Sequence, residues 1–311
     1  MIATVTLNPA LDKTVYVRKV RARDTNRILK IEQDAGGKGV NASRVLKELG
    51  SETVALGFIG GATGSFIEHV LQRDGIPTDF VHIAGVTRTN IAIQEEDGSP
   101  PTMLNEPGPE IRESELDALT AKVESAAARS YAVFFGGSVT CGAPPNIYST
   151  LISRVKAKGS LAILDADGAP LVEGLAAVPY MIKPNIDEAA RLFGARPQSE
   201  AEVAREARSI CERGVHLVVI SMGKKGAIAT TLEESWFAKA PEVLVVSTIG
   251  SGDSMVAGIL HALAQGGGVE EALRLGTAAG AATAMTTGAE IGRRADILRL
   301  VDQVVVKQLR P

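Results

Sequence analysis

The stretch that most constrains this chain is Thr248-Ile-Gly-Ser-Gly-Asp253-Ser-Met-Val-Ala-Gly258. It follows an apolar run, 243–246, that we expect to be a strand, and it leads into an apolar run from Met255 that is typical of a helix. Gly250, Ser251 and Gly252 then form a turn at a helix N-terminus, where unpaired N–H groups and the helix dipole attract anions, most commonly phosphate. Asp253, in the same first turn, is kept ionised there and can accept a proton. The stretch indicates phosphoryl transfer to a hydroxyl, although an acidic residue can also simply stabilise a helix start.

Composition narrows the class of protein. The 311 residues are 45% hydrophobic and 4% aromatic, as helices packed on a sheet require. The net charge of −3 and the absence of a long basic run argue against nucleic acid as a partner. Neither a signal peptide nor an apolar stretch of about 20 residues occurs, so we expect no membrane partner. The two cysteines lack metal-ligand spacing, and a reduced, cytoplasmic location fits best.

Short apolar runs alternate with amphipathic stretches along most of the chain, which predicts a mainly parallel sheet with helices on both faces. We expect this α/β architecture to form one doubly wound domain over residues 1–311. The expected strands are 2–7, 52–59, 131–136, 160–165, 179–182 and 216–220. The expected helices are 39–49, 64–74, 113–127, 144–157, 186–193, 200–213, 253–265, 269–285 and 294–307.

Residues 13–34 and 88–104 break this pattern, because they alternate apolar and polar side chains. Such alternation is typical of strands with one solvated face. We expect these two stretches to form a small sheet that stands off the main one, as a lid or as a dimer contact.

Two further segments have residues suited to ligand binding. In Gly36-Gly37-Lys38-Gly39-Val40-Asn41, glycines admit a close ligand, Lys38 adds a cation and Asn41 could hold two hydroxyls. In Lys183-Pro-Asn185-Ile-Asp-Glu188, Asn185 and Glu188 could hold a hydrated Mg²⁺. The same spacing also fits a plain capping box, and both interpretations stay open.

Several polar residues follow strand-like runs, and ligands of open α/β sheets gather at that edge. Ser221, Gly223 and Gly226 form a tight turn between strands that could meet nucleotide phosphates. Asp12 could grip sugar hydroxyls or merely start a turn. Asp165 and Asp167 lack the closing acidic residue of a calcium loop, so we expect strand-end turn residues close to the active cleft.

Taken in order, these motifs resemble the ribokinase/PfkB carbohydrate kinases over essentially the whole chain. The Gly36–Asn41 and Thr248–Asp253 segments look like the two family signatures, Asn185–Glu188 like its N-x-x-E magnesium motif, and Ser221–Gly226 like its nucleotide turn. Thr6-Leu-Asn-Pro-Ala-Leu-Asp12 together with Gly-Gly-Lys-Gly looks like the phosphosugar branch of fructose-1-phosphate, tagatose-6-phosphate and minor 6-phosphofructokinases.

The resemblance implies a ribokinase-like fold with a β lid, a homodimer formed through the lid, and ATP with Mg²⁺, a monovalent cation being a further option. It implies that Asp253 is the base and that the amides of Gly250, Ser251 and Gly252 form an anion hole. It assigns the sugar to Asp12, Gly36, Gly37 and Asn41, and the sugar phosphate to Lys38, Arg88, Ser138 and Arg27. It assigns the nucleotide to Lys183, Asn185, Ser221, Gly223, Gly226 and Thr248, and the metal to Glu188 and Asn185.

One departure from the family pattern concerns the loop after the middle strand. That branch commonly has Gly-Ser-Leu-Pro there, whereas this chain has Gly137-Ser138-Val-Thr-Cys141. We expect fructose 1-phosphate as the substrate and fructose 1,6-bisphosphate as the product, with tagatose 6-phosphate or fructose 6-phosphate kinases as alternatives. A catalytically inactive sugar-phosphate or nucleotide sensor on the same fold is the alternative from another class.

Overall fold

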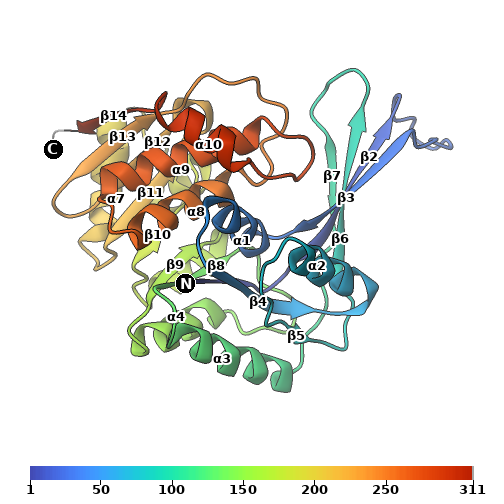
Figure 1. The fold of residues 1–311 in the computed structure, drawn as a ribbon, viewed down its shortest axis with the longest axis horizontal. Helices are drawn as coiled ribbons and strands as arrows, with labels where there is room; N and C mark the ends of the chain where they lie inside the picture. The colour runs from blue at the N-terminus through green and yellow to red at the C-terminus, as the bar shows by residue number, and fades with distance from the viewer. Residues whose placement is uncertain (310–311) are drawn as a thin grey trace.

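A computed structural model describes residues 1–309, and a ten-stranded sheet forms its centre (Figure 1). The strand order is β14-β13-β12-β11-β10-β9-β8-β1-β4-β5. The strands from β11 to β5 in this order are parallel, and β12, β13 and β14 are antiparallel. Their bounds are β1 Ile2–Thr6, β4 Thr53–Ile59, β5 Val81–His82, β8 Ala132–Gly136, β9 Leu161–Asp165, β10 Met181–Ile182, β11 Leu217–Ser221, β12 Ala227–Thr230, β13 Ser235–Lys239 and β14 Val305–Leu309.

Helices cover both faces of this sheet, each over its own apolar core. On one face lie α3 (Glu113–Ala127), α4 (Ile147–Ala157), α5 (Gly168–Leu175), α6 (Ile186–Phe193) and α7 (Glu200–Cys211). On the other lie α1 (Lys38–Leu49), α8 (Ser251–Ala264), α9 (Val269–Ala284) and α10 (Arg294–Val301). The strands between them are buried on both sides, which is why they read as continuous apolar runs. No helix within residues 1–309 is long and apolar enough to cross a membrane.

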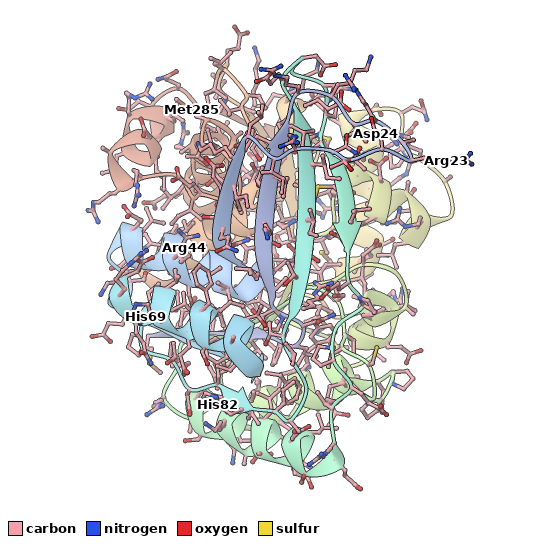
Figure 2. The ribbon with its side chains drawn as sticks, turned by 90° about the vertical axis from the view of Figure 1, so that its right-hand side faces the viewer. Arg23, Asp24, Arg44, His69, His82 and Met285 are labelled. Carbon is pink, nitrogen blue, oxygen red and sulfur yellow. The ribbon has the colours of Figure 1, made fainter. Side chains whose placement is uncertain are left out.

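A second sheet of four strands stands beside the first, and we call it the lid (Figure 2). Its order is β3 (Lys30–Gly36), β2 (Ala10–Val17), β6 (Arg88–Glu95) and β7 (Thr102–Asn105). Helix α2 (Gly61–Arg73) packs beneath it in a small third core with Val40 and Ile59. The two segments of alternating apolar and polar residues supply all four strands. Their alternation arises because one face of the lid is open to solvent. The expected α/β sheet with a lid is confirmed.

Two expected elements are wrong. Residues 243–246 form no strand but an exposed loop, in which the Leu244 side chain is 83% exposed. The expected helix 294–307 ends at Val301, and residues 305–309 form β14, which pairs with β13. Val304, Val305 and Val306 are β-branched and favour a strand once an edge is available. Helix α5 and strands β12 and β13 were not among the expected elements.

Helices α8 and α9 pack closely where Gly258 of α8 meets Gly276 of α9, and we call this contact the glycine crossing. It positions α8, the helix that carries Asp253. A Cβ atom on Gly258 would lie 2.8 Å from the Cα of Gly276 and 2.9 Å from the carbonyl oxygen of Leu275. Both contacts are with main-chain atoms that cannot rotate away. We therefore predict that Gly258→Ala lowers the free energy of unfolding by about 1–3 kcal/mol, because overpacking outweighs the better helix propensity of alanine. Urea denaturation measures this change.

Gly268→Ala is the matched control. Gly268 precedes α9 with a φ of −77°, and a Cβ atom there meets nothing within 4 Å. Its unfolding free energy should change by less than about 1 kcal/mol, the size of a lost N-cap preference. If Gly258→Ala and Gly268→Ala lowered the free energy of unfolding equally, the close contact between α8 and α9 would not be the cause of the destabilisation.

Candidate active site

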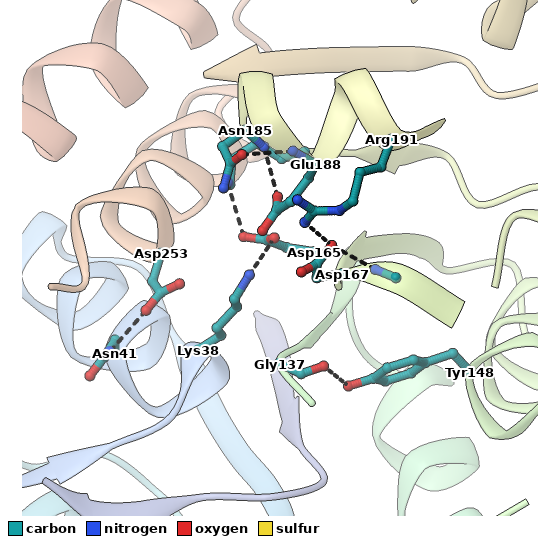
Figure 3. A network of polar contacts seen from close by, with 12 residues as sticks. Lys38, Asn41, Gly137, Tyr148, Asp165, Asp167, Asn185, Glu188, Arg191 and Asp253 are labelled. Carbon is teal, nitrogen blue, oxygen red and sulfur yellow. Dashed lines mark hydrogen bonds and ion pairs between the residues drawn. The ribbon is translucent and has the colours of Figure 1, made fainter. Parts of the chain in front are cut away.

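Polar residues gather where the parallel strands of the main sheet end. Asp165 is the last residue of β9, Lys183 follows β10, and Ser221 ends β11. The turn before α8 and the start of α1 face the same edge, so residues far apart in sequence share one site (Figure 3). This is the edge at which open α/β sheets bind ligands.

Asp253 lies in the first turn of α8, which begins at Ser251 with Gly250 in the left-handed conformation as its N-cap (φ 75°). The carboxylate accepts a hydrogen bond from Asn41 Nδ2 at 2.8 Å, from helix α1. Burial raises the pKa of Asp253 to about 6, the nearby Lys38 ammonium opposes this rise, and Asp165 adds to it. The Asp253 carboxyl is therefore ionised near neutral pH. Its pKa lies close enough to that pH for the group to exchange a proton.

Asp165 joins two lysines in a buried charge cluster. Its Oδ1 atom lies 2.7 Å from Lys38 Nζ, and its Oδ2 atom lies 3.1 Å from Lys183 Nζ. Burial alone would raise the pKa of Asp165, but the two ammonium groups hold it below its usual value. In turn, Asp165 and Asp253 outweigh burial and raise the pKa of Lys38. Lys38 therefore stays charged beside Asp253.

The anion-binding turn adjoins this cluster. A Cβ atom on Gly252 would lie 3.3 Å from Lys183 Nζ, so the absence of a side chain lets the ammonium group approach the turn. The Ser251 hydroxyl is buried and has no hydrogen-bond partner within the described residues. Main-chain amides, two cations and a carboxylate thus surround one point, and this arrangement suits a phosphoryl group that moves between two oxygens.

Asn185 and Glu188 form the capping box that the sequence allowed. Asn185 Oδ1 accepts from the N–H groups of Asp187 and Glu188, both at 2.9 Å, and Glu188 Oε2 accepts from the Asn185 N–H at 2.8 Å. The box fixes the first turn of α6 and places the Glu188 carboxylate near Lys38, whose pKa it raises. Only one Glu188 oxygen is used in the cap.

Asp12 occupies a second polar area, where the lid meets the main sheet. Its Oδ1 atom accepts a hydrogen bond from Asn90 Nδ2 at 2.9 Å, and burial raises its pKa. A Cβ atom on Gly36 would lie 1.9 Å from the Asp12 carboxylate, so a side chain there would displace that carboxylate. Next to Asp12 is a cavity of about 160 Å³ that Asn90, Asn105 and Ile249 also line. The buried Oδ1 atoms of Asn41 and Asn90 have no hydrogen-bond partner within residues 1–309, so both could accept from a hydroxyl.

Arg88 and Ser138 are held close to Asp12 by Asn8. Arg88 donates to the main-chain oxygens of Glu106 at 2.9 Å and Asn8 at 3.1 Å, and its Nε is buried without a partner in the described chain. The Asn8 amide donates to Ser138 Oγ at 3.2 Å. Arg88 and Ser138 thus both contact Asn8, and the Arg88 charge is close enough to Asp12 to oppose the rise in its pKa. Lys38 does not join them, because it is bonded to Asp165.

The remaining expected site residues are more scattered. Ser221 lies next to Asn185 through a single β-bridge, and Gly223 and Gly226 shape the turn between β11 and β12. The Thr248 carbonyl accepts from the Ser251 N–H at 3.3 Å. Gly37 precedes α1 with a φ of 123°. Arg27 is in the exposed segment between β2 and β3 and contacts none of the other site residues in the part of the chain described.

Sequence reasoning missed three residues that complete the site. Asn90 faces Asp12 across the parallel pairing of β2 and β6, and its place two residues after Arg88 was the available signal. Asn8, in Asn-Pro, gave no signal of its role. Buried Tyr148 donates to the Gly137 carbonyl at 2.9 Å and so holds the unusual 137–141 loop. Asp165 was expected near the cleft but not as its central anion.

Comparison with known proteins agrees with this geometry. The model of the pfkB family of carbohydrate kinases matches residues 5–295. The 1-phosphofructokinase of Borreliella burgdorferi is 38% identical over 92% of each chain, and that of Bacillus subtilis is 33% identical over 99% of this chain and 100% of its own. A crystal structure of phosphofructokinase-2 from Escherichia coli, in complex with potassium, superposes with a TM-score of 0.92 at 28% identity and covers 97% of this chain and 98% of its own. Other structures of that protein are described as a complex with fructose-6-phosphate and as a tetrameric inhibited form. The chain belongs to the pfkB family of carbohydrate kinases.

Proposed function

We propose that this kinase transfers the γ-phosphoryl group of ATP to fructose 1-phosphate and so forms fructose 1,6-bisphosphate. The observation that carries the proposal is the buried Asp253 carboxylate, set between the anion-binding turn and the Lys38–Asp165–Lys183 cluster. The choice of sugar follows the relatives, because those from Borreliella burgdorferi and Bacillus subtilis are both 1-phosphofructokinases.

Asp253 acts as the general base. Its carboxylate takes the proton of the sugar hydroxyl as that oxygen forms a bond to the γ-phosphorus, while the bond from phosphorus to the ADP oxygen breaks. Asn41 holds one carboxylate oxygen and leaves the other for the hydroxyl. The amides of Gly250 and Gly252, with the ammonium groups of Lys38 and Lys183, stabilise the negative charge of the transition state. The Ser251 amide would join them by giving up its long, 3.3 Å hydrogen bond to the Thr248 carbonyl.

Mg²⁺ would be held by Glu188, together with water and the ATP phosphates. The donor set fits, because Glu188 retains one carboxylate oxygen outside the capping box and Mg²⁺ typically takes only one or two protein carboxylates. When bound, the ion neutralises charge on the phosphates. The turn around Ser221, Gly223 and Gly226 would carry the nucleotide. A monovalent cation is a further expected cofactor, supported by the potassium complex of the Escherichia coli neighbour.

Arg88 would bind the phosphate that the sugar already carries. Arg88 is half-buried and pairs with Ala10, two residues before Asp12, and its Nε lacks a hydrogen-bond partner in the described residues. Ser138 lies beside it through Asn8. Asp12, Gly36, Gly37, Asn41 and Asn90 would then hold the sugar hydroxyls, and Arg27 would reach the phosphate only with movement of its exposed segment.

The lid carries an apolar surface that suits a homodimer. Ile31 (46% exposed) of β3 and Leu104 (52%) of β7 lie on the same face by the register of the four strands, and Leu29 (49%) lies two residues before Ile31. Met103 (46%) is on the opposite face, where it lines the Asp12 cavity, and Ile28 (50%) precedes β3. Clustered apolar side chains of this size on a sheet mark an interaction surface, and a second lid is the partner that matches them in chemistry. We therefore include a lid-to-lid dimer in the proposal.

A substrate panel tests the choice of sugar. With Mg-ATP, fructose 1-phosphate should give a higher kcat/KM than tagatose 6-phosphate or fructose 6-phosphate, measured by ADP release. Arg88→Ala should raise the KM for fructose 1-phosphate on the order of tenfold or more, because a charge-assisted bond to the phosphate is lost. Unphosphorylated fructose is the control, since its KM should not respond. A higher kcat/KM for either alternative substrate would refute the assignment.

Replacing the base tests the mechanism. Asp253→Asn should lower kcat by about 10²–10⁴-fold and change KM only a fewfold, because general-base help is lost while the shape is kept. In the parent enzyme, kcat/KM should fall below about pH 6, where Asp253 becomes protonated.

Thermal melting is the control for Asp253→Asn. Since the folded-state pKa of Asp253 lies above its usual value, the ionised carboxylate destabilises the fold, and this cost is fully present above about pH 6. The neutral variant should melt at pH 8 no lower than the parent. A variant with turnover within tenfold of the parent would place the base elsewhere.

Charged residues in the lid test the dimer. Ile31→Glu combined with Leu104→Glu should convert the dimer to a monomer in sedimentation velocity, because like charges would then face each other across an apolar contact. Leu298→Glu is the control, since Leu298 is 49% exposed but lies on α10, outside the lid. A parent protein that is monomeric, or a dimer that survives the double change, would contradict the lid interface.

A further inference from the structure

A second cavity, of about 170 Å³, lies at the foot of the lid and shares no lining residue with the Asp12 cavity. Arg44, Lys47 and Glu48 of α1 form one side of it, Asp74 after α2 another, and Arg293 before α10 a third. Figure 2 shows Arg44 beside the lid strands, where α1 and α2 approach them. None of these residues takes part in the site around Asp253.

The Arg44 guanidinium is the unusual group in this cavity. Its side chain is only 12% exposed, and its Nε and Nη1 atoms are buried without a hydrogen-bond partner in residues 1–309. The nearest carboxylate oxygen, on Asp74, is 3.7 Å from Nε, too far for a hydrogen bond. Buried donors of a charged group are costly to leave unmet, so a native structure normally supplies them with an acceptor.

The cavity is lined by three cations, Arg44, Lys47 and Arg293, and by two carboxylates, those of Glu48 and Asp74. Glu48 is already paired, because it accepts from Arg293 at 3.1 Å and from the main chain of Arg294 at 3.2 Å. Asp74 is also contacted by Arg73, at 3.3 Å. The charge of Arg44 opposes the rise in the pKa of Asp34 in the lid, but the two side chains form no ion pair. Lys47 has no ion-pair partner among the side chains described.

We propose that this cavity binds a small phosphate-type oxyanion, either inorganic phosphate or the phosphate group of a small monoester. Arg44 offers the Nε and Nη1 donors that lack an acceptor, and Lys47 and Arg293 add charge at the rim. The volume admits a phosphate group with a short carbon skeleton or a few waters. The site is distinct from the catalytic one, and its occupancy does not depend on the sugar that the enzyme uses.

Calorimetric titration of the full-length protein tests the site, with inorganic phosphate and glycerol 3-phosphate as separate probes. One binding event should survive Lys38→Gln, which removes a cation of the catalytic site. The same event should weaken on the order of tenfold or more in Lys47→Gln/Arg293→Gln, because two charged donors are lost. Tighter binding of glycerol 3-phosphate than of phosphate would identify a monoester as the ligand, and the reverse order would identify free phosphate.

Arg44→Lys keeps the positive charge that faces Asp34 and Asp74 but loses the planar fork. It should melt close to the parent and still bind both probes at least tenfold more weakly, by the same bond energies. Arg213→Gln, on an exposed position after α7, should bind them as the parent does. The proposal is overturned if neither probe binds the parent up to about 10 mM, a very weak affinity. It is equally overturned if the Lys47→Gln/Arg293→Gln and Arg44→Lys variants bind both probes like the parent.

Discussion

The pairing of Asp165 with Lys38 and Lys183 is the interaction on which the rest of the site depends. Its two ion pairs are short, at 2.7 and 3.1 Å, and the Asp165 side chain is only 1% exposed. A buried lysine without such a partner would lose its charge or leave the interior. Asp165 therefore holds the buried Lys183 and the partly exposed Lys38 together, and the charges of both lysines limit the rise in the pKa of Asp253. The cluster joins α1, β9, β10 and α8 at one point.

Several groups in this protein are left unsatisfied around that cluster, and they mark where ligands belong. Buried acceptors on Asn41 and Asn90, the hydroxyl of Ser251 and the Nε of Arg88 all lack partners within residues 1–309. Other buried groups without partners lie elsewhere, among them Arg44 Nε and Nη1 and the hydroxyls of Ser160, Thr230 and Thr277. The groups named first differ in that they gather near the edge of the main sheet at which open α/β folds bind ligands.

The sequence predicted the framework well because most of its signals are local. The capping residues of α6 and the glycine turn before α8 identify helix starts by their own chemistry, and both helices begin within two residues of the expected position. The two failures, residues 243–246 and the end of the expected helix 294–307, are valine-rich runs whose state depends on a distant partner. An edge strand forms only where another strand offers its main chain, and only β14 found that place beside β13.

The candidate site was predictable in its members but less so in their partners. Glycine and polar residues after strands indicated the right edge of the sheet, but spacing along the chain does not say which way a long side chain points. Lys38 was expected beside Arg88 at the sugar phosphate, and its ammonium group instead bonds Asp165. Residue 38 opens α1, and Gly136 leaves room for its side chain to run toward β9, since a Cβ atom on Gly136 would lie 2.7 Å from the Cβ of Lys38. We infer that Lys38 serves the transferred phosphoryl group, and that recognition of the phosphate already on the sugar rests on the lid through Arg88.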